Sequence, residues 1–279
     1  EDLNDYFKNY LSSNNRFISI VAPDFITNLP TEDEIEKLFQ TVSQKNIEPY
    51  EFELKNIELI KDDLTGSKIV KRKRFPRSNI IKLTLENGAD VYLKKTDFKK
   101  DEIQLKAFSW GGYSTVDIEN IASAKYAGDI LNYADLGEIS VNEKENLFQE
   151  KFVDVFPTIT ESGEGVMGNS NNKNLENMFK MLYLNFTDLR VKQNHVDRFI
   201  ERRINEYIID KENPKHESNV DYRKKLYQDH PRTIYPTDEF FNQINLKDVQ
   251  NFYKDRFIDA GSFDFIIVGD FEFETIEPL

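Results

Sequence analysis

The chain has 279 residues, a length that corresponds to about one or two domains. It is 39% hydrophobic, with 22 Phe and 13 Tyr, which excludes wholesale disorder, and no apolar run is long enough for a membrane span. The formal charge of −13 argues against a general nucleic-acid binder, and the lack of Cys excludes thiolate catalysis, disulfides and Cys-based zinc sites.

In the N-terminal third of the chain, the sequence pattern predicts few helices or strands. Apolar spacing indicates a helix over residues 1–15, and residues 16–22 have the pattern of a strand. Thr31 and Glu34 match a capping box, which predicts a helix from Thr31 to about Gln44. Residues 45–79 lack a clear period and are interpreted as an extended connector.

The remaining sequence alternates between sheet and helix patterns. Residues 80–85 and 91–93 alternate around Asn87-Gly88, a strong hairpin signal, and residues 101–109 predict a third strand. Helices are expected at 117–134, 143–152, 175–186, 196–208 and after a cap at Asn245, and strands at 153–160, 165–168 and 263–269, with 211–238 polar and Pro-punctuated. This order is typical of an α+β fold.

The two ends of the chain resemble each other. With a shift of 246 residues and no gap, Asp2, Phe17, Ile20 and Asp24 coincide with Asp248, Phe263, Ile266 and Asp270. We interpret this match as a duplication, which makes residues 1–25 the tail of one unit and the chain a piece of a longer protein with related halves.

A catalytic zinc site needs three protein ligands, commonly including two His at a short helical spacing. The three His residues, His195, His216 and His230, are too far apart in sequence for that pattern. His195 and His230 are interpreted as solvated surface residues.

Gly163, Gly165 and Gly168 fit the G-x-G-x-x-G pattern, and Asp188 follows about where a ribose-binding acid would lie. A dinucleotide-binding enzyme is the alternative that this pattern raises. It is disfavoured because Glu164 would place a negative charge beside the pyrophosphate and no βαβ start precedes the motif. The segment is instead interpreted as a Gly-rich turn before a helix capped by Ser170, Asn171 or Asn172.

A basic run gives +6 within ten residues, so the rest of the chain carries −19. A nuclear signal or nucleic-acid patch is the alternative, but Phe75 is the only interleaved aromatic residue. A solvated linker that pairs with an acidic surface is favoured. The run consists of Lys68, Lys71, Arg72, Lys73, Arg74 and Arg77.

Three segments together resemble the insulinase (pitrilysin) family of zinc peptidases. Residues 80–114, IIKLTLENGADVYLKKTDFKKDEIQLKAFSWGGYS, are similar to the family's opening strands, and the closing segment NLKDVQNFYKDRFIDAGSFDFIIVGDFEFETIEPL is similar to its last helix, strand and Gly-Asp turn. PTEDEIEKLF and IEPYEFE resemble the connector of large bacterial members with two homologous halves.

This resemblance implies an antiparallel sheet with helices packed on one face. It divides the chain into a tail of the preceding domain (1–25), a connector with one helix and the basic run (26–79), and a complete domain (80–279). It implies a catalytic half of the same parent chain and a peptide substrate as partners, and zinc in the parent. It favours the bacterial periplasm or cell envelope over the cytoplasm.

The sequence departs from the family where catalysis would reside. Catalytic halves carry H-x-x-E-H on the helix after the third strand, but here that helix reads DIENIASAKYAGDILNYADLG and has no His. We therefore assign no catalytic, metal, cofactor or substrate residue, and expect no peptidase activity from this chain alone. The resemblance implies a non-catalytic domain that helps enclose substrate; the alternative is a scaffold or binding module of the same fold.

Overall fold

The computed structural model describes residues 17–22, 26–45, 58–61, 64–148 and 151–279. The chain divides into two compact units, Glu1–Glu53 and Leu54–Leu279. The helix expected over residues 1–15 lies outside the described residues.

The described part of the first unit contains helix α2, Glu32–Ser43. The predicted capping box is confirmed: Glu34 N donates to Thr31 Oγ1 (3.4 Å), and Thr31 N donates to Glu34 Oε2 (2.8 Å). The strand expected at residues 16–22 is absent from the described residues 17–22, where Phe17 is 93% exposed. A strand needs a hydrogen-bonding neighbour, and no described strand pairs with this segment.

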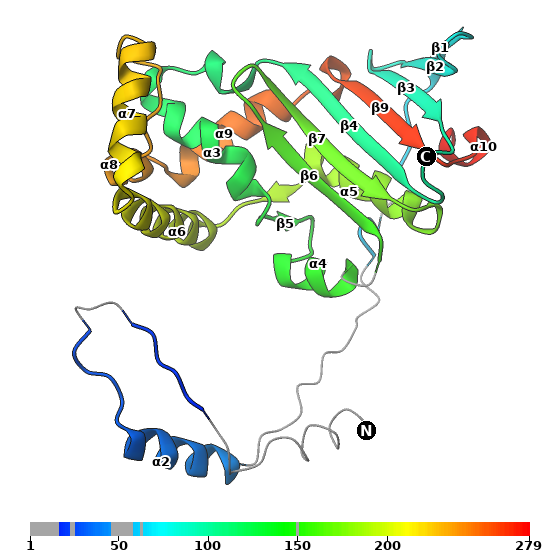
Figure 1. The fold of residues 1–279 in the computed structure, drawn as a ribbon. Helices are drawn as coiled ribbons and strands as arrows, with labels where there is room; N and C mark the ends of the chain where they lie inside the picture. The colour runs from blue at the N-terminus through cyan, green and yellow to red at the C-terminus, as the bar shows by residue number, and fades with distance from the viewer. Residues whose placement is uncertain (1–16, 23–25, 46–57, 62–63, 149–150) are drawn as a thin grey trace. The chain divides into compact units, whose positions relative to one another are not determined.

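The second unit is built on a seven-stranded sheet (Figure 1). All neighbouring strands are antiparallel except β3 and β9, which are parallel. The fold class expected from the sequence, α+β with a mostly antiparallel sheet, is therefore confirmed. In spatial order the strands are β1 (Ile69–Phe75), β2 (Ile80–Leu85), β3 (Asp90–Lys95), β9 (Asp264–Gly269), β4 (Ile103–Trp110), β7 (Gly163–Ser170) and β6 (Val153–Ile159).

The predicted hairpin is present between β2 and β3. Leu83 pairs with Val91, and Gly88 adopts a positive φ of 95°, as the turn requires. On β4 the predicted inward face is buried, with Ile103, Leu105 and Ala107 each no more than 2% exposed.

Helices α3, α5 and α9 pack against one face of the sheet (Figure 1). Their alanine, leucine and phenylalanine side chains form one core with the inward residues of the strands. The helices are α3 (Ile121–Leu131), α4 (Val141–Phe148), α5 (Leu175–Thr187), α6 (Gln193–Lys211), α7 (Pro214–Leu226), α8 (Asp238–Phe241), α9 (Leu246–Phe257) and α10 (Phe273–Ile276); β5 (Asp135–Leu136) and β8 (Leu189–Arg190) form a separate small pair.

Two further differences from the sequence interpretation lie in segments expected to be irregular. Residues 69–75, which the sequence analysis placed in the connector, form edge strand β1. The sequence did not predict this strand because a strand exposed on both faces shows no alternation of hydrophobic and polar residues. The polar segment 211–238 contains helix α7, which begins at Asn213 as N-cap with Pro214 in its first turn. That Asn-Pro pair is the helix-start signal that the polar composition obscured.

No helix among the described residues combines the length and the hydropathy needed to cross a bilayer.

Candidate functional site

Helix α3 is the element on which the family resemblance would place zinc ligands. It follows β4, the third strand of the domain expected at 80–279, and buries most of its residues against the core. Ala122, Ala127 and Ile130 are all fully buried. A Cβ added at Gly128 would lie 3.1 Å from the backbone nitrogen of Ile159, so the helix packs closely on β6. The helix thus supplies packing surface where a metal site would need imidazoles.

One charged side chain on α3 faces an aromatic environment. Lys125 Nζ lies 5.0 Å from the ring centre of Tyr113 and 5.5 Å from that of Tyr126. Burial lowers the pKa of the Lys125 ammonium below its ordinary value, while the nearby Asp129 carboxylate opposes that shift. A cation held over rings in this way contributes to packing and is no ligand for a metal ion.

The three His residues lie on separate elements. His195 is half-buried in the first turn of α6, where its Nδ1 accepts a hydrogen bond from Lys192 N (3.4 Å), and burial lowers its pKa. His216 Nδ1 lies 2.7 Å from Asp210 Oδ2, and His230 Nδ1 accepts from Arg232 N (3.2 Å). No cluster of His, Asp and Glu capable of holding a metal occurs within the described ranges. The residues that the structure describes therefore do not fit a zinc ion.

The G-x-G-x-x-G segment forms strand β7, which confirms the strand expected at residues 165–168, whereas the interpretation of the segment as a Gly-rich turn is wrong. β7 pairs with β4 on one side and β6 on the other. Glycine is needed at Gly165 because an added Cβ would lie 2.0 Å from the carbonyl oxygen of Ala107. Asn171 Oδ1 accepts from Asn174 N (3.0 Å) and caps the short 3-10 turn Asn172–Asn174, whereas helix α5 begins after Asn174 without a side-chain cap. A strand paired on both edges lacks the free amides of a phosphate-binding turn.

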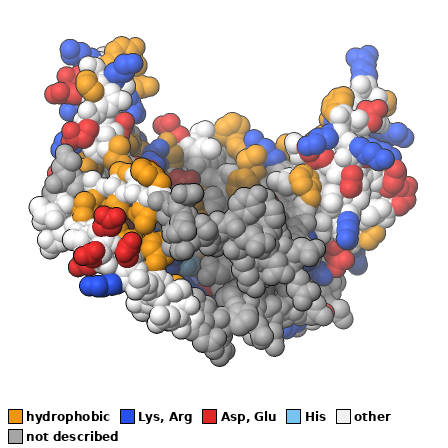
Figure 2. Space-filling model, turned by 60° about the horizontal axis from the view of Figure 1, so that its bottom comes forward, with side chains coloured by type: hydrophobic (Ala, Val, Ile, Leu, Met, Phe, Trp, Pro, Cys, Tyr) orange, Lys and Arg blue, Asp and Glu red, His pale blue; other side chains and the backbone are white. Residues whose placement is uncertain are grey.

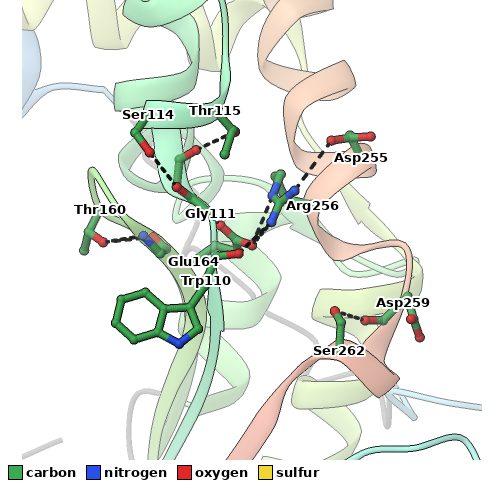
Figure 3. Close-up of polar contacts among 12 residues, drawn as sticks. Trp110, Gly111, Ser114, Thr115, Thr160, Glu164, Asp255, Arg256, Asp259 and Ser262 are labelled. Atoms are coloured by element: carbon green, nitrogen blue, oxygen red, sulfur yellow. Dashed lines mark hydrogen bonds and ion pairs between the residues drawn. The ribbon is translucent and has the colours of Figure 1, made fainter.

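Glu164, inside this motif, forms the most buried ion pair of the described residues (Figure 3). Its side chain is fully buried, and Oε1 accepts from Arg256 Nε (3.0 Å) and Nη2 (2.5 Å). Oε2 accepts from Gly112 N (2.5 Å), and Arg256 Nη2 also donates to Trp110 O (2.9 Å). This Glu164–Arg256 clamp joins α9, β7 and the end of β4.

Two glycines make room for the clamp. Gly111 has a φ of 155°, and an added Cβ would lie 2.2 Å from Arg256 Nη2. Gly112 has a φ of 66°, and an added Cβ would lie 2.3 Å from Thr160 O. Because every oxygen of Glu164 accepts a hydrogen bond from the protein, the clamp is suited to fixing the strand ends rather than to proton transfer.

A cavity of about 410 Å³ lies among α6, α7 and the segment before α8. Arg203, Arg223 and Tyr235 contribute to its wall, together with the His216–Asp210 pair. Both Arg203 Nε and Tyr235 Oη are buried without a hydrogen-bond partner. The sequence interpretation missed this cavity because it contained no helix α7.

The comparisons with known proteins agree with this geometry. No family model matches the sequence. The probable zinc protease PqqL of Haemophilus influenzae is 22% identical over 219 residues, which cover 77% of this chain and 23% of that protein. A zinc protease PQQL-like protein of Arabidopsis thaliana is 28% identical over 96 residues, or 34% of this chain and 10% of that protein. The chain therefore spans less than a quarter of the curated relatives it matches.

Solved structures show the same fold. The periplasmic protease PqqL from Escherichia coli superposes with a TM-score of 0.71 at 18% identity, covering 89% of this chain and 27% of that one. An inactive M16 peptidase domain from Pseudomonas fluorescens superposes with a TM-score of 0.58 at 16% identity, covering 72% of this chain and 48% of that one. The predicted resemblance is confirmed in sequence and in fold.

Proposed function

We propose that this chain, which resembles the M16, insulinase-like peptidases in sequence and fold, is a non-catalytic domain of a larger zinc metalloendopeptidase. In this proposal it helps to enclose a peptide substrate against a catalytic half of the same parent chain. The observation that carries the proposal is helix α3, which follows the third strand of an M16-like domain but contains no His and packs through alanines.

The extent of the match supports a parent with further domains. The chain covers 23% of the Haemophilus relative and 27% of the Escherichia coli structure, both of which are named as proteases. We propose that zinc belongs to the catalytic half, since the described residues of this chain offer no site for it. The periplasm or cell envelope is the proposed location, by analogy with the Escherichia coli protein named periplasmic.

The proposed division of the chain keeps residues 1–25 as the tail of a preceding domain. It also keeps 26–79 as a connector that carries helix α2, with the qualification that its last part, strand β1, joins the sheet of domain 80–279. The ungapped match between the chain ends supports the tail assignment.

Two steps test the proposal. The first is to read the open reading frame upstream of Glu1: H-x-x-E-H in that frame is expected, and its absence would favour the scaffold alternative. The second uses the full-length protein, inactivated at the Glu of that motif and incubated with a peptide that carries a photo-crosslinker. We expect crosslinks to residues of the 80–279 domain as well as to the catalytic half. Crosslinks confined to other parts of the protein would contradict a role in enclosing substrate.

A further inference from the structure

Strand β1 is an open and strongly basic edge of the sheet. It pairs with β2 on one side, from Arg72 opposite Leu83 to Phe75 opposite Ile80, and no described strand pairs with its other side. Six of its seven residues are exposed. Every second residue of such a strand points its N–H and C=O away from the sheet, where an extended chain can bind them.

The charge of this edge is concentrated and largely unneutralised. Residues 68–77 carry six positive side chains and no negative one. Of these six, Arg72 is the one that forms an ion pair within the described part of the chain, with Glu277 (Nη2–Oε2 2.6 Å). Figure 2 shows Lys and Arg side chains on the arm at the right, interspersed with Asp and Glu side chains, where Figure 1 places β1 to β3.

Repulsion within the sheet adds to this imbalance. Lys73 lies directly opposite Lys82 in the β1–β2 pair, and like charges at facing positions oppose each other. Lys82 is already paired with Asp90 (2.6 Å), which raises the pKa of the Lys82 ammonium. Lys73 Nζ instead lies 4.7 Å from the ring centre of Phe75. An acidic strand on the open side of β1 would give Lys73 the counter-charge that β2 does not supply.

We propose that β1 is a docking edge for an extended acidic polypeptide segment, which adds to the sheet as an eighth strand. Backbone hydrogen bonds provide the attachment, and carboxylates on both faces of the added strand meet the basic side chains, because Lys71 and Lys73 lie on one face of β1 and Arg72 and Arg74 on the other. This site goes beyond the proposed enclosing role and does not depend on it.

The charge pattern argues against two other occupants. A second copy of the chain would bring one basic edge against another, and like charges across a strand pair are destabilising. A nucleic acid would be repelled by the net charge of −19 on the rest of the chain. It would also find only one aromatic residue in the basic run, Phe75, on which a base could stack. An acidic peptide satisfies both the charge and the open hydrogen-bonding edge.

Binding of labelled peptides to the 279-residue chain, measured by fluorescence anisotropy at low salt, tests the proposal. The probe is a short peptide in which glutamates at both odd and even positions are interspersed with valine and isoleucine. Two control peptides carry the same sequence with N-methyl groups on alternate amides, one in each phase. We expect the parent peptide to bind and one N-methylated phase to lose binding much more than the other, since only one set of amides faces β1.

Charge reversal locates the site. K71E/K73E is expected to weaken binding by at least about tenfold, because two exposed attractive pairs become repulsive. The matched variant K100E/K211E, which makes the same change of net charge at exposed lysines outside β1, should bind within about twofold of the wild type. Far-UV circular dichroism checks that both variants fold.

Four results would overturn the proposal: no binding of the parent peptide, equal binding of all three peptides, equal weakening by the two double variants, or tighter binding of a single-stranded oligonucleotide than of the peptide. The second and fourth would indicate a purely electrostatic surface, and the first would mean that the basic side chains only protect an open edge from aggregation.

Discussion

Replacing Arg256 by Met should destabilise the second unit strongly, because it leaves a buried carboxylate with one hydrogen-bond donor. Glu164 is fully buried at its side chain, and Arg256 supplies two of the three hydrogen bonds that its oxygens accept, with Gly112 N supplying the third. Methionine has a similar length and fills most of the same space without the charge.

The expected cost follows from the burial of the pair. Breaking a buried ion pair from one side costs about 3–5 kcal/mol, and Arg256 is 24% exposed, so water can reach part of the site and the lower end, about 3 kcal/mol, is expected. For a domain of this size that corresponds to a fall in the melting temperature of about 6–12 °C. The double variant E164Q/R256M should be less destabilised than R256M, because no unpaired charge remains buried.

Urea unfolding followed by circular dichroism measures these free energies. The matched control is K254M, which removes one positive charge from the same turn of α9 at an exposed position and should change the free energy of unfolding by less than about 0.5 kcal/mol. If R256M unfolds at the same urea concentration as K254M, or if the double variant costs as much as the two single changes added together, the clamp does not stabilise the fold as argued.

Three further perturbations test individual parts of the structure. G165A should destabilise the sheet by about 1–3 kcal/mol in urea unfolding, because the added Cβ would collide with Ala107 O. In the control G66A the added Cβ meets nothing within 4 Å, so this variant should be neutral. Equal effects of the two substitutions would contradict the close approach of β4 and β7. Burial raises the pKa of Tyr253, so the unfolded state loses the tyrosine proton first and the free energy of unfolding should fall as the pH rises above the ordinary tyrosine value of 10.0. Y253F should lose less stability over that pH range. Identical dependence of stability on alkaline pH in the wild type and Y253F would argue against this burial. T31A should weaken α2 by about 1 kcal/mol, which would appear as faster amide exchange in the first turn of the helix. Hydrogen bonds from Thr31 lower the pKa of Glu34, so the same turn of the wild-type helix should fray as the pH falls below 4.5. Unchanged amide exchange in both experiments would contradict the capping box.

Local signals in the sequence predicted local structure. Thr31 and Glu34 are three residues apart, Asn245 and Asp248 likewise, and both caps are present because a cap depends only on neighbouring residues. Asn87-Gly88 specified the hairpin, because Gly88 adopts the positive φ that the turn needs and the alternating flanks fix the register. The loop spans residues 86–88 and is closed by a hydrogen bond from Leu85 N to Ala89 O (2.9 Å). The inward face of β4 followed from simple alternation of apolar residues.

Features that depend on distant residues could not be read in the same way. Glu164 and Arg256 are 92 positions apart, and nothing in either segment indicates the other. The parallel pairing of β3 with β9 also joins residues from opposite ends of the domain. Strand β1 was not predicted for a different reason. An edge strand that is exposed on both faces can consist of charged residues, so the composition of residues 69–75 resembled that of a linker.

The absence of zinc ligands on α3 was the sequence feature with the greatest consequence for function. It separates the fold of this chain from the zinc chemistry that the family resemblance would otherwise imply. The structure shows what holds this helix on the sheet: its alanine and isoleucine side chains are no more than 5% exposed and pack into the core.

Zinc content of the purified 279-residue chain bears most directly on the proposal of a non-catalytic domain. After equilibration with excess zinc and extensive dialysis, inductively coupled plasma mass spectrometry should find far less than one zinc per chain, with no hydrolysis of a quenched fluorescent peptide. One tightly held zinc per chain, together with peptide hydrolysis that a chelator abolishes, would contradict the assignment and identify this chain as a catalytic unit.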